Sequence, residues 1–209
     1  MELHYLIGDA TEPIVKPAII SHVCNDCVPG AWGAGFVMAL SKKNKDPEKA
    51  YRKWSLEGPE GGYELGAIQL VPFAEDVMVA NMIAQHEIRW RGKIPPIRYD
   101  AVEKCLTNVY KHALEHGWTV AMPRIGCVLA GGDWLTIENI IKKVMTVDTY
   151  VYTIPSQKDR WPTKYENDTA DTSKVDISSD LGDVVIPPDI DSTADTTIVD
   201  TSDLGSFFN

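Results

Sequence analysis

Short apolar runs and longer amphipathic segments alternate along residues 1–155. Apolar runs bounded by Gly, Pro or Asp are typical of buried strands, whereas apolar residues three or four positions apart are typical of helices that cover a sheet. We therefore expect strands at residues 3–7, 18–23, 65–71, 77–84, 118–122 and 149–154. We expect helices at residues 35–43, from 46 past 54, at 99–115 and at 134–145.

The ends of several helices are marked by particular residues. Asp46 is expected to cap the second helix with Pro47 at its first helical position, and Gly117 is expected to end the third helix as a C-cap. Residues 85–97 contain Ile94-Pro95-Pro96-Ile97 and cannot be helical throughout.

The order of these elements predicts an α/β fold. Strands that alternate with helices form a mixed, mainly parallel central sheet with helices on both faces, and such sheets bind ligands at the carboxyl ends of their strands. We place this domain at residues 1–157. Residues 158–209 are expected to be a flexible acidic tail.

The charge of −10 belongs almost entirely to the last part of the chain. Up to Arg160 there are 18 Lys and Arg against 19 Asp and Glu, and after it 2 against 11. The segment is rich in Asp, Ser and Thr, a composition that buries too little apolar surface to offset the entropy of ordering. It also repeats, because residues 169–172 return at 193–196 and residues 179–182 at 202–205. One interpretation is a duplication in a solvated tail; the other is that Phe207-Phe208 docks a partner protein.

The near-neutral body lacks the clustered basic face of a duplex-binding module. No run of about 18 apolar residues exists, so we expect no membrane association. Met1 to His4 lacks the charged and apolar regions of a signal peptide, which predicts a cytoplasmic protein.

Two residue groups invite a metal interpretation that the remaining sequence does not favour. Cys24-x-x-Cys27 lacks two further closely spaced ligands for zinc, and no helix clearly starts at Cys24 as in a thioredoxin-like redox pair. His112 and His116 are spaced as two metal ligands would be, but no third accompanies them. We therefore expect neither a metal nor a cofactor.

Two glycine-rich loops follow apolar strands and lead directly into helices. One spans residues 25–35, with Gly30, Gly33 and Gly35; the other spans residues 124–133, with Gly126, Gly131 and Gly132. Glycine lets backbone N–H groups approach an anion, and the N-terminus of the following helix favours negative charge. Neither loop has a Walker or dinucleotide pattern. Together they predict a diphosphate held between two loops.

Three motifs resemble the macrodomain, an ADP-ribose-binding family, across residues 2–155. Gly8-Asp9-Ala10-Thr11 matches its first-strand motif. His22-Val23-Cys24-Asn25 with residues 30–35 looks like the first ligand loop of the yeast-type ADP-ribose 1''-phosphate phosphatases. Met122-Pro123-Arg124-Ile125-Gly126-Cys127 resembles the second loop of the branch that includes the terminal ADP-ribose protein glycohydrolase.

The resemblance implies a role for each matching position. Asp9 would accept a hydrogen bond from the adenine amino group, and the second loop would wrap the diphosphate and distal ribose. The implied substrate-binding residues are Asp9, Ala10, Asn25, Gly33, Ala34, Arg124, Ile125, Gly126, Cys127, Val128, Leu129 and Ala130.

The pattern departs from the glycohydrolase branch at two positions. A lysine that forms a covalent sugar adduct there corresponds to Gln85 here, and an assisting aspartate corresponds to Ala130, which puts a Schiff-base route in doubt. The polar residues that remain for the distal ribose are His22, Asn25, Asp26, His86 and Asp133.

Several of these side chains have a functional and a structural interpretation. His22 is expected to be the general acid and base, or else a histidine that fixes the strand end by hydrogen bonds. Asn25 would bind the ribose hydroxyls or stabilise its turn, and Asp133 would act in catalysis or as a helix N-cap. Trp32 and Trp134 would form a wall of the site or pack in the core. The basic run at residues 89–93 would be a lid that contacts phosphate or a solvated loop.

We expect an enzyme that removes the 1''-phosphate from ADP-ribose. The alternatives are removal of ADP-ribose from protein or nucleic acid, and a binding module without turnover. The expected partners are accordingly ADP-ribose, its 1''-phosphate or an ADP-ribosylated macromolecule.

Overall fold

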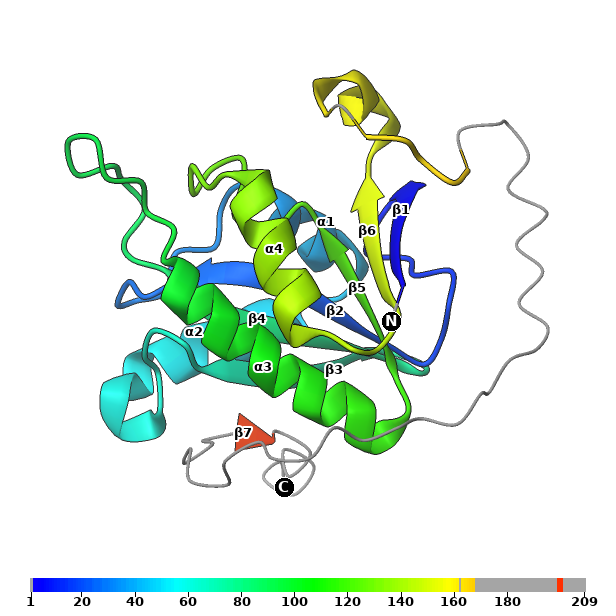
Figure 1. Ribbon diagram of the computed structural model, residues 1–209. Helices are drawn as coiled ribbons and strands as arrows, with labels where there is room; N and C mark the ends of the chain where they lie inside the picture. The colour runs from blue at the N-terminus through cyan, green and yellow to red at the C-terminus, as the bar shows by residue number, and fades with distance from the viewer. Residues whose placement is uncertain (1, 162, 168–198, 201–209) are drawn as a thin grey trace.

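The computed structural model describes residues 2–161, 163–167 and 199–200, and it has three layers (Figure 1). The central sheet contains β1 (Leu3–Ile7), β2 (Ala18–Asn25), β3 (Ile68–Ala74), β4 (Val77–Gln85), β5 (Thr119–Pro123), β6 (Thr149–Thr153) and the two-residue β7 (Val199–Asp200). The helices are α1 (Phe36–Lys43), α2 (Asp46–Glu57), α3 (Tyr99–His116) and α4 (Trp134–Val144), with short 3-10 turns η1 (Gly58–Gly61) and η2 (Pro155–Arg160).

The sheet has the order β1-β6-β5-β2-β4-β3-β7. Strands β1, β6, β5, β2 and β4 are parallel, and β3 runs antiparallel to β4. The five parallel strands therefore end at one edge. The predicted mixed, mainly parallel sheet is confirmed.

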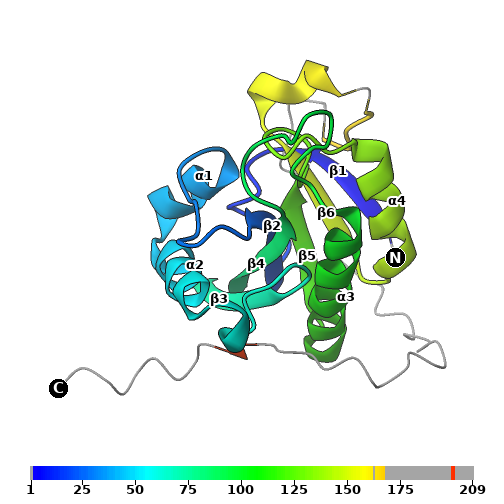
Figure 2. The same cartoon turned by 90° about the vertical axis from the view of Figure 1, so that its left-hand side faces the viewer.

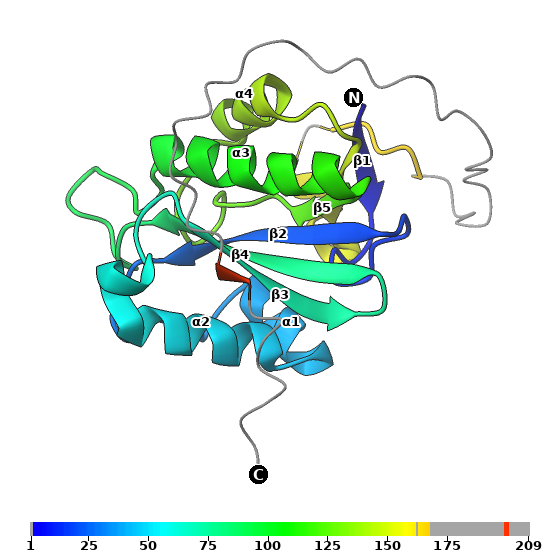
Figure 3. The same ribbon diagram turned by 90° about the horizontal axis from the view of Figure 1, so that it is seen from below.

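Helices cover both faces of this sheet, as Figures 2 and 3 show from two directions: α1 and α2 lie on one face and α3 and α4 on the other. The core beneath α3 and α4 contains Ile19, Met82, Leu106 and Ile137. The opposite core contains Trp54 among the residues packed under α1 and α2. Two buried faces explain why the central strands are nearly continuous apolar runs.

One of the two predicted helix caps is confirmed and the other is wrong. Gly117 ends α3 in the left-handed conformation at φ 67°, as predicted. Asp46 is the first residue of α2 and Lys45 is its N-cap, not Asp46 as expected. The reason is that the Asp46 N–H donates to Asn44 Oδ1 at 2.8 Å, so the capping acceptor lies upstream.

The segment after η2 packs against the outer edge of β1. The Asn167 side chain accepts from Ile7 N at 2.7 Å and donates to Ile7 O at 2.9 Å. Glu166 N donates to Tyr5 O at 2.9 Å, and Tyr165 is buried. The expected boundary at residue 157 is therefore too early, because the packed domain continues through Asn167. Sequence periodicity did not reveal this docking, since the segment forms no strand or helix of its own.

The remaining predictions for the tail, including its flexibility, the repeats and the Phe207-Phe208 docking tip, lie outside the described residues. Val199–Asp200 is the exception and pairs with Gln69 and Leu70 of β3.

Replacing Asn167 with Ala should destabilise the domain. The variant leaves the N–H and C=O of Ile7 without their partner, which costs about 1–3 kcal/mol of unfolding free energy. Urea unfolding measures this, with the exposed Lys164→Ala as a control. An unchanged unfolding free energy for Asn167→Ala would show that the segment does not dock.

Candidate functional site

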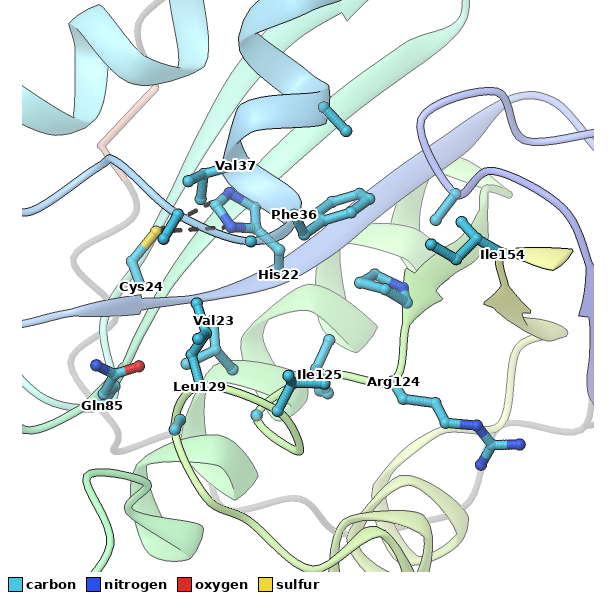
Figure 4. Close-up of a pocket in the computed structure, with 18 of the residues that line it drawn as sticks. His22, Val23, Cys24, Phe36, Val37, Gln85, Arg124, Ile125, Leu129 and Ile154 are labelled. Carbon is cyan, nitrogen blue, oxygen red and sulfur yellow. Dashed lines mark hydrogen bonds between the residues drawn. The ribbon is translucent and has the colours of Figure 1, made fainter. Parts of the chain in front are cut away.

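A cleft of about 760 Å³ opens at the carboxyl ends of the parallel strands (Figure 4). Its walls come from the ends of β1, β2, β4, β5 and β6, from the loop before α1 and from the loop after β5. Asn25 and Gly126, which are far apart in the chain, both line it. The two glycine-rich loops thus meet at one site.

Side chains of the loop and of α2 hold the first loop in place. Asn25 accepts from Ala31 N at 3.1 Å and donates to Ala31 O at 2.7 Å. Tyr51 donates to Asn25 O at 2.7 Å, Ser55 accepts from Gly30 N at 2.8 Å, and Arg52 donates to Gly30 O at 3.0 Å. The Asn25 amide is therefore engaged in the turn, the structural alternative considered above.

The first loop leaves its last N–H groups unpaired. Within the described residues no hydrogen bond involves the N–H of Gly33, Ala34 or Gly35, and all three residues line the cleft. Helix α1 begins at Phe36, so its own first N–H groups also lack helical partners. This end of the cleft therefore presents several unpaired backbone donors.

The second loop has the same property. The N–H groups of Ile125, Gly126, Val128, Leu129 and Ala130 have no hydrogen-bond partner in the part of the chain that is described, and these residues line the cleft. The loop is closed by a bond from Gly132 N to Gly126 O at 2.8 Å.

Gly126 and Gly35 show why glycine is required in these loops. Gly126 has φ 70°, and a Cβ there would lie 2.7 Å from Ile97 Cδ1. Gly35 has φ 77°, and a Cβ there would lie 3.0 Å from Leu129 Cδ1 of the opposite loop. The second contact shows that the two loops approach each other across the cleft.

Most predicted binding residues line this cleft. They are Asp9, Ala10, Asn25, Gly33, Ala34, Arg124, Ile125, Gly126, Val128, Leu129 and Ala130. Cys127 does not: its thiol is buried and donates to Ile125 O at 3.3 Å. Cys127 therefore shapes the loop from within through its thiol, and the ligand contacts of all the predicted residues remain predictions.

The Arg124 side chain points away from the cleft centre (Figure 4). Its guanidinium lies 5.1 Å from the ring centre of Tyr5 and 4.8 Å from those of Trp134 and Trp161. It also donates to Thr163 Oγ1 at 2.6 Å. Arg124 thus ties the C-terminal segment to the loop after β5, and only its backbone is placed to serve a ligand.

His22 is held in a buried network. Its Nε2 lies 2.7 Å from Asn81 Oδ1, and the Asn81 amide donates to Pro47 O and Gln69 Oε1, both at 3.1 Å. Because Oδ1 is the acceptor, Nε2 carries the proton. Cys24 Sγ lies 3.7 Å from Nδ1, so both ring nitrogens have partners.

This environment argues against His22 as the general acid and base. His22 lines the cleft, but burial lowers its pKa to about 4 and both ring nitrogens already have partners. The contacts fit the structural alternative, in which His22 fixes the end of β2 to β4.

Two tryptophans and Asp133 also take their structural interpretations. Trp32 is buried, packs edge-on against His22 and donates to Ser41 Oγ at 2.8 Å. Trp134 packs on Arg124. Asp133 caps α4 by accepting from Thr136 N at 2.8 Å, and this hydrogen bonding holds the pKa of its carboxyl below its usual range.

Gln85 and Ala130, the positions of the lysine and aspartate in the resembling branch, both line the cleft. Gln85 Nε2 donates to Glu87 O at 2.7 Å. Neither position offers an amine or a carboxylate.

Asp26 and His86 lie beside the cleft and contact each other, with Asp26 Oδ2 2.7 Å from His86 Nδ1.

Sequence reasoning missed one wall of the cleft. It comes from the end of β6 and the turn beyond it, and includes Tyr152, Ile154, Gln157 and Trp161. This wall could have been predicted from the parallel orientation of the last strand, because a parallel β6 must end at the same edge of the sheet as β2 and β5.

No group of three or more potential metal ligands occurs among the described residues, and the four cysteines are free. None of the described helices combines the length and apolar character that a membrane crossing requires.

Proteins of known structure share the fold of this chain. No family model matches the chain. A solved Bacteroides thetaiotaomicron protein of unknown function is 48% identical, with a TM-score of 0.68 over 73% of this chain and 98% of that one. A macrodomain protein from Streptomyces coelicolor is 40% identical, with a TM-score of 0.64 over 73% of this chain and 99% of that one.

A curated relative extends the comparison to a longer protein. The chromodomain-helicase-DNA-binding protein 1-like of Danio rerio is 31% identical over 151 residues, or 68% of this chain. The match covers only 14% of that relative's length. Given the near-complete coverage of the Streptomyces coelicolor protein, the chain belongs to the macrodomain family.

The buried His22 should make the fold sensitive to acid. Its folded pKa of about 4 lies below the ordinary value of 6.5, so the unfolded chain binds more protons between these values and stability falls as the pH drops through this window. His22 contributes at most about 1.4 kcal/mol of this loss per pH unit.

Urea unfolding at pH 7 and pH 5 measures this dependence. A His22→Gln variant, which keeps a donor for Asn81, should be less stable at pH 7 but lose less stability between the two pH values. An equal loss in both proteins would show that His22 does not resist protonation.

Proposed function

We propose that this chain binds ADP-ribose in the cleft and hydrolyses a bond at the 1'' carbon of the distal ribose, with the 1''-phosphate as its leading substrate. The observation that carries the proposal is the set of unpaired N–H groups on two facing loops, at residues 33–35 and at residues 125, 126 and 128–130. Backbone donors of this kind bind phosphate oxygens without a basic side chain.

The charge of the cleft supports a diphosphate bound by the backbone. Among the lining residues Arg124 is the cation, and its guanidinium is turned into the aromatic side chains of Tyr5, Trp134 and Trp161. An anion in the cleft would therefore be neutralised chiefly by N–H dipoles and by the N-terminus of α1.

The two ends of the cleft suit the two ends of the ligand. Asp9 follows β1, and its Oδ1 accepts from Thr11 N at 2.9 Å, which fixes the carboxylate at this end of the cleft. The family resemblance implies that this carboxylate accepts from the adenine amino group. Gln85 ends β4, four strand positions away in the sheet. At about 4.8 Å per strand, this separation is about 19 Å, enough for an extended dinucleotide-like molecule.

The residues at the distal end favour a substrate whose leaving group is stable as an anion. Gln85 and Ala130 supply no amine for a covalent adduct and no carboxylate to assist it. A departing phosphate needs less such assistance than an amide or base nitrogen, so we place the 1''-phosphate ahead of ADP-ribosylated protein or nucleic acid. Catalysis would rest mainly on positioning and on backbone stabilisation of charge.

One solved structure with the same fold contains a ligand of the proposed kind. An Oceanobacillus iheyensis macrodomain, 15% identical with a TM-score of 0.51, carries ADPR in its structure. At this identity the similarity supports the shared fold alone, so the assignment of ligand to this chain depends on its own loops.

Gly33 offers a direct test of where the ligand lies. A Cβ at Gly33 meets no atom within 4 Å and its φ is outside the left-handed region, so Gly33→Val fills the cleft without straining the fold. We expect ADP-ribose affinity to fall by about tenfold or more, equivalent to about 1.4 kcal/mol, with an unchanged melting temperature. Calorimetry measures the affinity, and Gly33→Ala should lose less. Undiminished affinity in the folded Val variant would place the ligand elsewhere.

A substrate panel decides the reaction. We expect the full chain to release phosphate from ADP-ribose 1''-phosphate faster than it releases ADP-ribose from modified protein or modified DNA. Preferred turnover of a modified macromolecule would replace the leading substrate with the first alternative. Tight ADP-ribose binding with no product from any substrate would identify a binding module instead.

A further inference from the structure

A second hollow of about 480 Å³ adjoins the distal end of the cleft. It is lined by Asp26, Cys27, Val28, His86, Glu87, Ile88 and Arg89. Ile88 also lines the main cleft, so the two spaces share a wall. Asn25 and Gln85 line the cleft, and the residues that follow them on these neighbouring strands, Asp26 and His86, line the hollow.

Asp26 and His86 form a fixed pair in this hollow. Asp26 Oδ2 lies 2.7 Å from His86 Nδ1, and Asp26 Oδ1 accepts from Glu87 N at 2.7 Å. The backbone is tied as well, because Asp26 N donates to Gln85 O at 2.9 Å. Their side chains are 19% and 32% exposed, so the imidazole remains reachable from solvent.

The pair leaves one ring nitrogen available. Donation of the Nδ1 proton to Asp26 leaves Nε2 as the acceptor, and no described residue forms a hydrogen bond with Nε2. A carboxylate that fixes the tautomer and orientation of a histidine in this way is a general arrangement for proton transfer. His22, by contrast, has partners on both nitrogens.

The geometry points to His86 as the proton shuttle of this site, with Asp26 as its positioning residue; the inference rests on the proposed function. The oxygen of a water forms a bond to C1'' as the bond between C1'' and the phosphate oxygen breaks. The phosphate oxygen keeps the electron pair of the broken bond. His86 Nε2 takes a proton from the water and passes it to the released phosphate. The products are ADP-ribose and hydrogen phosphate, and the imidazole returns to its neutral form.

The surroundings of the pair fit a phosphate in the second hollow. Arg89 lines this hollow and offers a cation. The carboxylate of Glu87 is engaged by Arg91 Nε at 3.1 Å, which offsets its repulsion of an anion. The released group would therefore leave through the hollow while the ADP-ribose portion stays in the cleft.

The test compares His86→Ala, Asp26→Asn and the unmodified full chain on the substrate that the panel selects. His116→Ala is a control, because His116 is exposed at the end of α3 and lines neither space. We expect His86→Ala to lower kcat by about 100-fold or more, with the Kd for ADP-ribose unchanged by calorimetry. Added imidazole should restore part of the rate. Asp26→Asn should lower kcat at unchanged KM.

Each other outcome has a distinct meaning. A kcat within about threefold of the unmodified chain in a folded His86→Ala variant would overturn the inference and leave the proposed function intact. If that variant is unfolded by its melting curve, Asp26→Asn decides by the same criterion. No turnover by the unmodified chain would overturn both the inference and the proposed hydrolysis.

Discussion

The site depends on keeping backbone N–H groups unpaired at the edge of a parallel sheet. Buried or enclosed donors without partners are costly, so the surrounding structure must hold them in place. Asn25, Tyr51 and Arg52 fix the first loop through its carbonyl groups, and Gly132 closes the second through Gly126 O. The donors that remain face one cleft, and an anion that accepts from both loops would satisfy them.

Sequence periodicity was sufficient for the elements that position this cleft. The apolar run beginning at Ala18 and the spacing of Val102, Leu106 and Val109 predicted β2 and α3, because each buries a repeating face against the sheet. Glycines predicted both loops, since Gly126 must adopt positive φ close to Ile97. The convergence of the loops then followed from parallel strands ending at one edge.

Side-chain direction and irregular segments were beyond the sequence signal. Arg124 lies in a ligand-loop motif, yet three aromatic rings from distant parts of the chain draw its guanidinium away from the cleft. Residues 163–167 dock on β1 through a few hydrogen bonds, to Tyr5 and Ile7, that have no periodic pattern. The sequence favoured His22 over His86 as the general acid and base. Their partners, Asn81 and Asp26, separate a buried histidine from a half-buried one.

The most direct measurement of the central claim is the amide spectrum of the isotope-labelled chain during titration with ADP-ribose. If the diphosphate is bound by main-chain donors of both loops, the N–H resonances of residues 33–35, 125, 126 and 128–130 shift together and saturate at one ligand concentration. Adenosine, which lacks the diphosphate, should leave most of them unmoved. Saturating ADP-ribose that shifts neither loop, or only one of them, would contradict the claim.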